Sequence, residues 1–301
     1  MKLNIIQKIN RPRLLIIGCG DVGMRLLPLL RTRFRVFAVT SHAARGAALR
    51  AAGAIPIVAD LDHPASLVRL AGLAHYIVHL APPPADGLLD RRSRNLTAIL
   101  PERARLVYVS TSGVYGHCSG ALISETHPVA PQNARAVRRV DAEQVLRAWA
   151  RGSHSALAIL RVPGIYASDR LPLTRLQLGT PALIDSDDVY TNHIHADDLA
   201  RIIVRALWHG LPGRVYHAVD DSDLKMAQYF DAVADACALP RPPRLARAAL
   251  QQVVAPVLLS FMSESRRMTN GRIKSELGVR LRYARVADAL ALLAPAKMTP
   301  Q

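Results

Sequence analysis

Three glycines with fixed spacing carry the clearest chemical signature of this chain. Gly18, Gly20 and Gly23 form a GxGxxG pattern between the apolar run Leu14–Ile17 and a helical pattern. The first glycine permits a tight turn, the second lets backbone N–H groups approach a diphosphate, and the third lets the helix, whose N-terminus holds the anion, pack closely on the sheet. The loop predicted to bind a dinucleotide consists of Gly18, Cys19, Gly20, Asp21, Val22 and Gly23. A glycine-rich turn without a ligand is the alternative interpretation.

The end of the second predicted strand, Phe34–Val39, distinguishes between the two nicotinamide dinucleotides. An acidic residue at this place accepts hydrogen bonds from the ribose hydroxyls of NAD and repels the 2'-phosphate of NADP. No acidic residue occurs between this strand and Asp60, whereas Thr40 and Ser41 offer hydroxyl donors and Arg45 offers a positive charge. The sequence therefore favours NADP as cofactor, and NAD is the alternative if Arg45 is only a solvated helix residue.

These residues need a scaffold that brings the ends of several strands together. Short β-rich runs alternate with helical patterns, and this order predicts a Rossmann-like α/β fold with a doubly wound parallel sheet. The predicted strands after the first two are Ile55–Ala59, Tyr76–Leu80 and Arg105–Ser110. Because parallel strands end at one carboxyl edge, we expect the residues that follow them to meet at one ligand site.

A series of short motifs extends this pattern along almost the whole chain. After the glycine turn come Asp60-Leu61, His79-Leu80-Ala81, Val109–Gly116, Arg161–Tyr166, Asn192–Ala200 and Gly213–Asp220. This order resembles the extended short-chain dehydrogenase/reductase family, which includes nucleotide-sugar epimerases and dehydratases. The resemblance implies that Asp60 and Leu61 contact the adenine and that Ala81 packs beside the cofactor. It places Thr111 at the catalytic Ser/Thr position of the family.

The predicted cofactor site also includes residues beside these motifs, namely Leu80, Pro82, Ser110 and Pro163. Pro82 opens a run of three prolines, which cannot continue a strand or a helix interior. We therefore expect a stiff loop at the carboxyl edge of the sheet.

The catalytic helix departs from the family's pattern. Family enzymes carry a Tyr and a Lys four residues apart on the helix after the Ser/Thr strand, where they face one site. On the predicted helix Ala134–Trp149, counting back from Glu143 places Arg139 at the Lys position and Arg135 at the Tyr position. Guanidinium stays charged near neutrality, so neither residue replaces an acid–base catalyst. Arg139 is still predicted to hold a ribose or a phosphate of the cofactor.

The glycine spacing departs as well, because Ile17 stands where extended members usually have the first glycine of GxxGxxG. Both departures resemble the atypical branch of the family, in which the cofactor fold is kept and the catalytic pair varies. Some members are enzymes with rearranged chemistry, and others are cofactor-binding regulators.

Two tyrosines are candidates for the missing acid–base group. Tyr115 lies four residues after Thr111, and Tyr166 follows a Pro-Gly pair that predicts a loop. Either phenol is a possible proton donor beside the nicotinamide. A structural role in the site wall is the alternative for both.

Two histidines have the spacing of a metal site. His193 and His195 point to one face if they lie on a strand, and Asp197 follows them. The favoured interpretation is structural, with Asp197 or Asp198 as the N-cap of a helix and no metal bound.

The composition restricts the partners. The 301 residues carry 39 basic and 23 acidic side chains, which gives a net charge of +16. The arginines are spread along the chain without a basic tail, so nucleic-acid binding is disfavoured and an anionic small molecule is favoured. The three cysteines have no CxxC spacing, which predicts neither disulfides nor a zinc site. We expect a cytoplasmic protein without a membrane span, either a monomer or a homodimer.

The chain divides by pattern into two parts. Residues 1–160 are predicted to form the NAD(P)-binding domain and residues 161–301 a smaller, mainly helical substrate lobe, from which about 189–194 and 214–219 return to the first domain. The substrate site is expected in the cleft between them, near Thr111, Pro163–Tyr166 and Arg175. The predicted function is oxidoreductase or epimerase/dehydratase-like chemistry on a nucleotide-linked or other anionic small molecule. The alternative is a non-catalytic NAD(P)-binding regulatory or scaffold protein.

Overall fold

A seven-stranded parallel sheet forms the centre of the molecule. The computed structural model describes residues 11–255, 258–259 and 262–293. In sheet order the strands are β12 (Arg214–His217), β7 (Ala156–Val162), β5 (Arg105–Thr111), β4 (Tyr76–His79), β1 (Arg13–Ile17), β2 (Arg35–Thr40) and β3 (Ile55–Val58). Every neighbouring pair is parallel. The predicted doubly wound Rossmann-like fold is confirmed.

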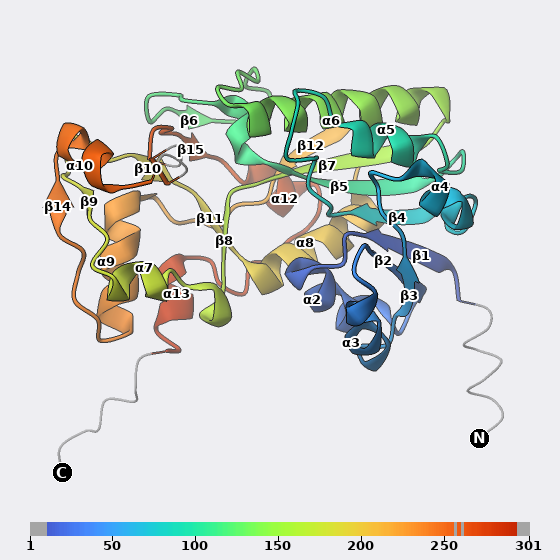
Figure 1. The fold of residues 1–301 in the computed structure, drawn as a ribbon, viewed down its shortest axis with the longest axis horizontal. Coiled ribbons are helices and arrows are strands. Elements are labelled where there is room, and N and C mark those ends of the chain that lie inside the picture. Colours follow the sequence, from blue (N-terminus) through green and yellow to red (C-terminus); the bar gives the residue numbers. More distant parts are fainter. Residues whose placement is uncertain (1–10, 256–257, 260–261, 294–301) are drawn as a thin grey trace, which may run out of the picture.

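Helices cover both faces of this sheet (Figure 1). One face carries α2 (Asp21–Leu30), α3 (Gly46–Ala51) and α8 (Ala196–His209). The other carries α4 (Pro64–Leu67), α5 (Arg91–Thr97) and α6 (Ala134–Gly152). Single 3-10 turns are η1 (Ala43–Arg45), η2 (Val68–Leu70) and η3 (Ser112–Tyr115). None of the helices in the described part of the chain is long and apolar enough to cross a membrane.

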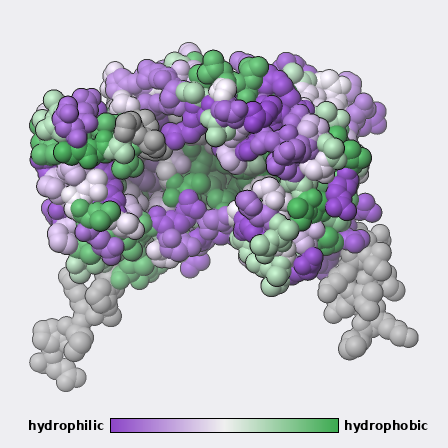
Figure 2. Space-filling model, in the orientation of Figure 1, coloured by the Kyte–Doolittle hydropathy of each residue, from purple (hydrophilic) through white to green (hydrophobic). Residues whose placement is uncertain are grey.

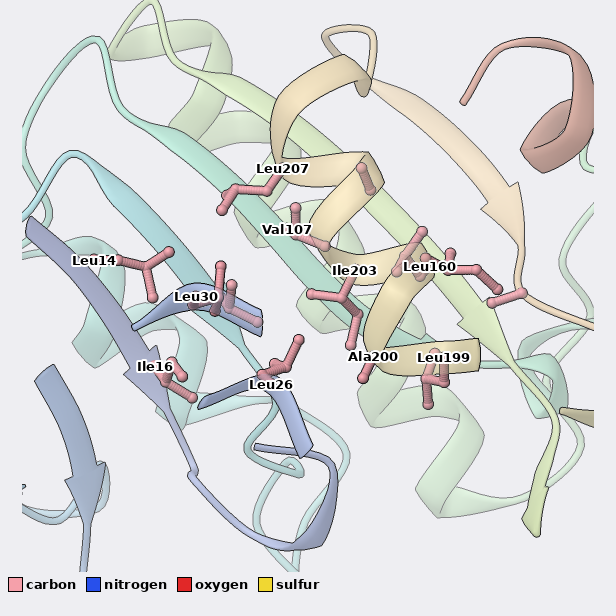
Figure 3. Packing of buried hydrophobic residues seen from close by; sticks show 14 of the residues in the cluster. Leu14, Ile16, Leu26, Leu30, Val107, Leu160, Leu199, Ala200, Ile203 and Leu207 are labelled. Atoms are coloured by element: carbon pink, nitrogen blue, oxygen red, sulfur yellow. The ribbon is translucent and has the colours of Figure 1, made fainter. Parts of the chain in front are cut away.

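Strand β1 shows why both faces must be covered. Leu14 and Ile16 point into the core beneath α2 and α8, whereas Leu15 and Ile17 point into the core on the opposite face. All four side chains are at most 1% exposed. Figure 3 shows the first of these cores, where leucines of α2 meet α8 above β1 and β5. A continuous apolar run is what a parallel strand buried on both faces requires.

A second lobe lies beside the carboxyl edge of the sheet (Figure 1). Short strand pairs build its frame: β8 (Gly164–Tyr166) with β11 (His193–His195), β9 (Ala182–Leu183) with β14 (Arg244–Leu245), β10 (Tyr190–Thr191) with β13 (Leu224–Lys225), and β6 (Leu122–Ile123) with β15 (Arg267–Met268). Its other elements are η4 (Ser168–Arg170), α7 (Leu173–Gln177), α9 (Met226–Ala236), α10 (Arg247–Val253) and α13 (Val286–Leu290), while α12 (Gly271–Ser275) packs against β12.

The segments predicted to return to the first domain do so differently. Residues 214–217 form the edge strand β12 of the main sheet. Residues 189–194 pair with β13 and β8 in the small sheets and lead into α8, which packs on the main sheet. The division of the chain at residue 160 stays a prediction.

Helix α8 begins differently from the prediction. The predicted N-cap, Asp197 or Asp198, is wrong, because the Nδ1 atom of His195 accepts a hydrogen bond from the N–H of Asp197 at 3.2 Å. The side chain of Asp198 is buried and instead accepts hydrogen bonds from the backbone N–H groups of Arg282 and Tyr283. The His195 ring also packs on Tyr283, with ring centroids 3.8 Å apart. The cap therefore also connects α8 to the segment after α12.

A buried ion pair connects α6 to the sheet. The Arg161 guanidinium on β7 donates two hydrogen bonds to Glu143 on α6, the shorter at 2.7 Å, and both side chains are at most 6% exposed. Glu143 also accepts a hydrogen bond from the hydroxyl of Ser110, at 2.6 Å. Arg161 donates a further bond to the hydroxyl of Tyr115, 2.8 Å away. This network holds α6 against the carboxyl ends of β5 and β7.

Replacing Glu143 by alanine should destabilise the protein by about 3–5 kcal/mol, because Arg161 is then buried without its counter-charge. Urea denaturation followed by circular dichroism measures the free energy of unfolding. The control is Arg241→Ala, which breaks the exposed ion pair with Asp235 and should leave the midpoint nearly unchanged. Equal, small effects of the two substitutions would contradict the importance of the buried pair.

Candidate functional site

The glycine turn after β1 has the geometry that a dinucleotide requires. Gly18 has a φ of +79°, and a Cβ atom there would lie 2.7 Å from the backbone of Ala81. A Cβ atom on Gly23 would lie 2.8 Å from the Sγ atom of Cys19. Around Gly20, in contrast, no atom of the described residues other than its chain neighbours lies within 4 Å of the Cβ position. Two glycines are thus needed for packing, and the third leaves open space over the backbone.

The helix that follows the turn offers its N-terminus to that space. The N-cap residue of α2, Gly20, has no side chain to accept hydrogen bonds, so the first backbone N–H groups of the helix have no capping partner. The carboxylate of Asp21 lies in this first turn, but Arg25 and Arg170 pair with it at 3.3 and 2.8 Å. Arg25 also binds Asp169 and Asp197, which ties α2 to the second lobe. The residues present therefore fit the diphosphate of NAD(P).

The residues predicted to choose the cofactor surround the end of β2. The Thr40 hydroxyl is buried and accepts a hydrogen bond from the N–H of His42 at 3.2 Å, whereas Ser41 is exposed. Arg45 in η1 is half-buried and close enough to Cys19 to act on its charge. Burial raises the pKa of the Cys19 thiol to about 11, although the positive charge of Arg45 acts to lower it. The thiol is thus neutral, and the positive charge of Arg45 acts on the glycine turn.

Two loops on the adenine side are fixed by α5. Asp60 follows β3 and accepts a hydrogen bond from the N–H of Asp62, which lowers the pKa of the Asp60 carboxyl. Arg92 on α5 binds Asp62 at 2.6 Å and donates a second bond to the carbonyl of Pro82 at 3.0 Å. The carbonyl of Leu61 accepts a hydrogen bond from Asn95. The structure thus holds the Asp60 and Pro82 loops in fixed positions relative to each other.

The strand end after β4 contacts the glycine turn directly. The N–H groups of Leu80 and Ala81 both donate to the carbonyl of Ile17, at 2.8 and 3.1 Å. The Leu80 side chain lies 3.4 Å from the Cβ position of Gly23. The structure therefore brings these predicted residues together around the turn.

Arg139, at the predicted lysine position, lies beside β5. Arg139 donates hydrogen bonds to the carbonyl of Val109 at 2.9 Å and to the hydroxyl of Tyr108 at 3.0 Å. Its guanidinium carbon also lies 5.7 Å from the centre of the Tyr108 ring. Ser110 is buried and bonded to Glu143, as described above. Both predicted residues thus lie at the strand that ends in Thr111, with hydrogen bonds that fix their positions.

A cleft of about 620 Å³ separates the sheet's carboxyl edge from the second lobe. In Figure 2 the surface is hollowed between the two lobes, and hydrophobic residues lie at the floor of the hollow. The predicted residues Thr111, Pro163 and Arg175 line the cleft, together with Arg135 at the family's Tyr position. The Thr111 Oγ1 atom accepts a hydrogen bond from the N–H of Gly113 at 3.3 Å.

Positive charge dominates the walls of this cleft. Among the described residues that line it, Arg135, Arg175 and Arg266 are cationic, and Glu264 is the acidic one. Arg175 packs over the ring of Phe230 at 4.4 Å, and burial lowers its pKa. Arg266 pairs with Glu264 at 2.9 Å, yet its buried Nε atom has no hydrogen-bond partner. The lining of the cleft therefore carries an excess of positive charge.

The structure does not bring the two candidate tyrosines into the cleft lining. Tyr115 is 1% exposed, and its hydroxyl lies 2.5 Å from the Nε2 atom of His217 and accepts a hydrogen bond from Arg161. Tyr166 is equally buried, and burial beside Asp220 raises the pKa of its hydroxyl. Their catalytic role stays a prediction, whereas their surroundings favour the structural alternative.

Sequence reasoning missed the part of the cleft that comes from distant segments. Glu264 and Arg266 precede β15, which pairs with β6, and Tyr229 comes from α9. His193 lines the cleft with its ring stacked on Tyr229, 4.1 Å between centroids, and burial lowers its pKa to about 3. The sequence drew attention to His193 through its pairing with His195, and in the structure His193 forms part of the cleft wall. Among the described residues no group suited to a metal ion is present.

Fold and turn together define an α/β protein that binds a dinucleotide. Residues 14–218 match the profile of the NAD dependent epimerase/dehydratase family, and this chain belongs to that family. The family depends on NAD, and the open space at Gly20, the uncapped α2 and the arginine near Cys19 fit NAD(P). The resemblance in the motifs is thereby confirmed.

Solved structures and curated relatives agree with this assignment. A functionally unknown conserved protein from Silicibacter pomeroyi DSS is 29% identical, with 94% of this chain and 98% of that chain covered and a TM-score of 0.79. A dTDP-glucose 4,6-dehydratase from Streptomyces venezuelae, solved with NAD and TYD bound, is 22% identical over 94% and 95%, with a TM-score of 0.74. A curated dTDP-glucose 4,6-dehydratase from Actinoplanes sp. is 24% identical over 144 residues, 45% of each chain. The chain thus matches less than half the length of its curated relatives.

Two matched substitutions test the place of the diphosphate. Gly20→Ala should fold like the wild type, because its Cβ meets no atom, but should weaken NADPH binding roughly tenfold by occupying the diphosphate's space. Gly18→Ala should lower the melting temperature even without ligand, because its Cβ clashes with Ala81. Thermal unfolding and NADPH fluorescence titration measure the two effects. Unchanged NADPH affinity in folded Gly20→Ala protein would place the diphosphate elsewhere.

Proposed function

We propose that the protein is an enzyme that prefers NADP to NAD and acts on a nucleotide-linked or other anionic small molecule. The reaction is oxidoreductase or epimerase/dehydratase-like. The observation that carries the proposal is the position of Thr111, which ends β5 and lines a cleft rich in arginine. The activity of the Actinoplanes and Streptomyces relatives supports a nucleotide-linked substrate.

In the proposed mechanism one residue of the cleft supplies a hydrogen bond and the arginines supply positive charge. The bound nicotinamide supplies or accepts a hydride. The Thr111 hydroxyl donates a hydrogen bond to the reacting oxygen, while its oxygen accepts one from the N–H of Gly113. Arg135 places a permanent positive charge at the same cleft, which stabilises an oxygen that gains negative charge. Arg175 and Arg266 hold the anionic part of the substrate.

In the proposed mechanism the proton is not supplied by a Tyr-Lys pair. Arginine does not release a proton near neutrality. Burial keeps His193 neutral and raises the pKa of Tyr229, so neither residue changes charge near pH 7. The proposed route is the hydroxyl of Thr111, which would donate its proton to the reacting oxygen as the hydride is transferred and regain a proton from the solvent, so that solvent supplies the net proton.

NADPH should bind roughly tenfold more tightly than NADH, because Arg45 forms a charge-assisted hydrogen bond with the 2'-phosphate. Arg45→Ala should abolish most of this preference. The matched control is Arg50→Ala on the following helix α3, which removes an exposed arginine and should keep the preference. Parallel titrations of both cofactors measure the ratio. Equal affinities in the wild type would contradict the NADP assignment.

Thr111→Ala should reduce turnover of a responsive substrate by roughly 100-fold, because the hydrogen bond to the reacting oxygen is lost. NADPH affinity should not change. Thr111→Ser, which keeps the hydroxyl, should retain most of the activity. Net oxidation of NADPH measures an oxidoreductase reaction, whereas chromatography of substrate and product measures an epimerase or dehydratase reaction, in which the cofactor regains its hydride. If alanine and serine variants are equally active, Thr111 is not part of the mechanism.

A non-catalytic NAD(P)-binding regulator is the second candidate. It is favoured by the arginine at the Tyr position and by Tyr115 and Tyr166 lying outside the cleft lining. Such a protein binds NADPH tightly but converts none of the compounds in a screen of nucleotide sugars and phosphorylated carbonyl compounds, whether by net NADPH oxidation or by a change in the compound itself. Turnover that depends on Thr111 distinguishes the enzyme from the regulator.

A further inference from the structure

The edge of the sheet opposite the glycine turn is strongly basic. Because all seven strands are parallel, their first residues lie at one edge, and β1, β2, β5 and β12 each begin with arginine. Arg13 and Arg35 are register partners on neighbouring strands, and both are exposed. Arg33 lies two residues before Arg35. The fold thus gathers arginines that are far apart in the sequence.

A groove of about 920 Å³ lies at this edge. It is formed by the C-terminal ends of α2 and α8 together with residues 278–280. Four arginines line it: Arg33, Arg201, Arg205 and Arg280. No aspartate or glutamate is found among the described residues of its lining. We call this site the basic groove.

The positive charge of the basic groove is only partly compensated. Arg201 pairs with Asp198 at 3.5 Å, and Arg205 donates to the neutral carbonyl of Leu277 at 2.6 Å. The side chains of Arg33 and Arg280 are exposed and form no hydrogen bond or ion pair with any other described residue. The four arginines carry positive charge and the paired Asp198 removes one unit of it. The two helix C-termini contribute about −0.5 charge each, so a net charge of about +2 remains at the groove.

The floor of the basic groove is apolar and aromatic. Trp208 stacks on Phe34, with ring centroids 5.2 Å apart, and also packs against Tyr76. These contacts hold the indole in place although it is only half-buried. Leu29 beside it is 41% exposed. The groove therefore combines fixed cations at its rim with a rigid apolar surface.

We propose that the basic groove binds single-stranded nucleic acid, with its phosphates on the arginines and a base against Trp208 and Leu29. Guanidinium groups match phosphate oxygens in charge and geometry. Exposed arginines on adjacent strands extend the charge beyond one phosphate, as a polymer requires and a mononucleotide does not. Stacking on an aromatic floor needs unpaired bases, which favours a single strand over a duplex. The proposal does not depend on the proposed enzymatic function.

The test is fluorescence anisotropy with a labelled oligo(dT) of about 12 nucleotides, with saturating NADPH present to block the dinucleotide site. The wild type should bind with a strong salt dependence. The double variant Arg33→Ala/Arg280→Ala should weaken binding roughly tenfold and reduce the slope of log K against log salt by about 1.4, since each lost phosphate contact contributes about 0.7. Both residues are exposed, so the variant should fold.

The control removes two charges elsewhere on the surface. Arg91→Ala/Arg241→Ala breaks exposed ion pairs of α5 and of the second lobe and should leave affinity and slope near the wild-type values. No binding by the wild type in the presence of NADPH, or equal effects of the two double variants, would each overturn the proposal, as would binding that appears only when NADPH is left out. Inorganic polyphosphate that competes as well as oligo(dT) would also overturn it, because bases then contribute nothing.

Discussion

The close approach of Gly18 to the backbone of Ala81 is the constraint on which the site depends. The N–H groups of Leu80 and Ala81 bind the carbonyl of Ile17, so β4 stays against β1 past its end and leaves no room for a side chain at Gly18. This contact sets the direction in which the chain leaves β1. The N-terminus of α2 and the open space at Gly20 follow from it, and the Pro82 loop is held at the same edge by Arg92.

Two arginines lie at the positions where the sequence predicts the catalytic pair to be replaced. At the predicted lysine position, Arg139 is bound to β5 through Val109 and Tyr108. At the predicted tyrosine position, Arg135 lines the cleft beside Thr111. The buried Glu143–Arg161 pair holds the helix that carries both arginines against the sheet. In the proposed mechanism this arrangement stabilises negative charge and leaves proton transfer to a hydroxyl and to water.

Local patterns were sufficient to predict the fold and the cofactor turn. The glycine spacing, the apolar runs and the strand–helix alternation all act over a few residues, and the helix of Arg135 and Arg139 begins where the sequence predicted. The position of the Tyr115 hydroxyl could not be predicted from local patterns. Tyr115 is close to Thr111 in sequence, but the single turn η3 directs its hydroxyl to His217 and Arg161 in the interior.

The other half of the cleft depended on contacts that no local pattern contains. Glu264 and Arg266 reach it because β15 pairs with β6, more than 100 residues earlier in the chain. The N-cap of α8 was missed for a similar reason, since the ring of His195 is held by Tyr283 from a distant segment. The basic groove likewise exists only after folding, because its arginines come from three separate parts of the chain.

We propose that NADPH lies along the carboxyl edge from Arg45 to Thr111. Hydrogen exchange followed by mass spectrometry, with and without NADPH, locates the bound cofactor. We expect slower exchange of the backbone N–H groups at residues 18–24, 60–62, 80–82 and 111–113, with no change at residues 278–280. Protection absent from residues 18–24, or confined to the basic groove, would contradict it.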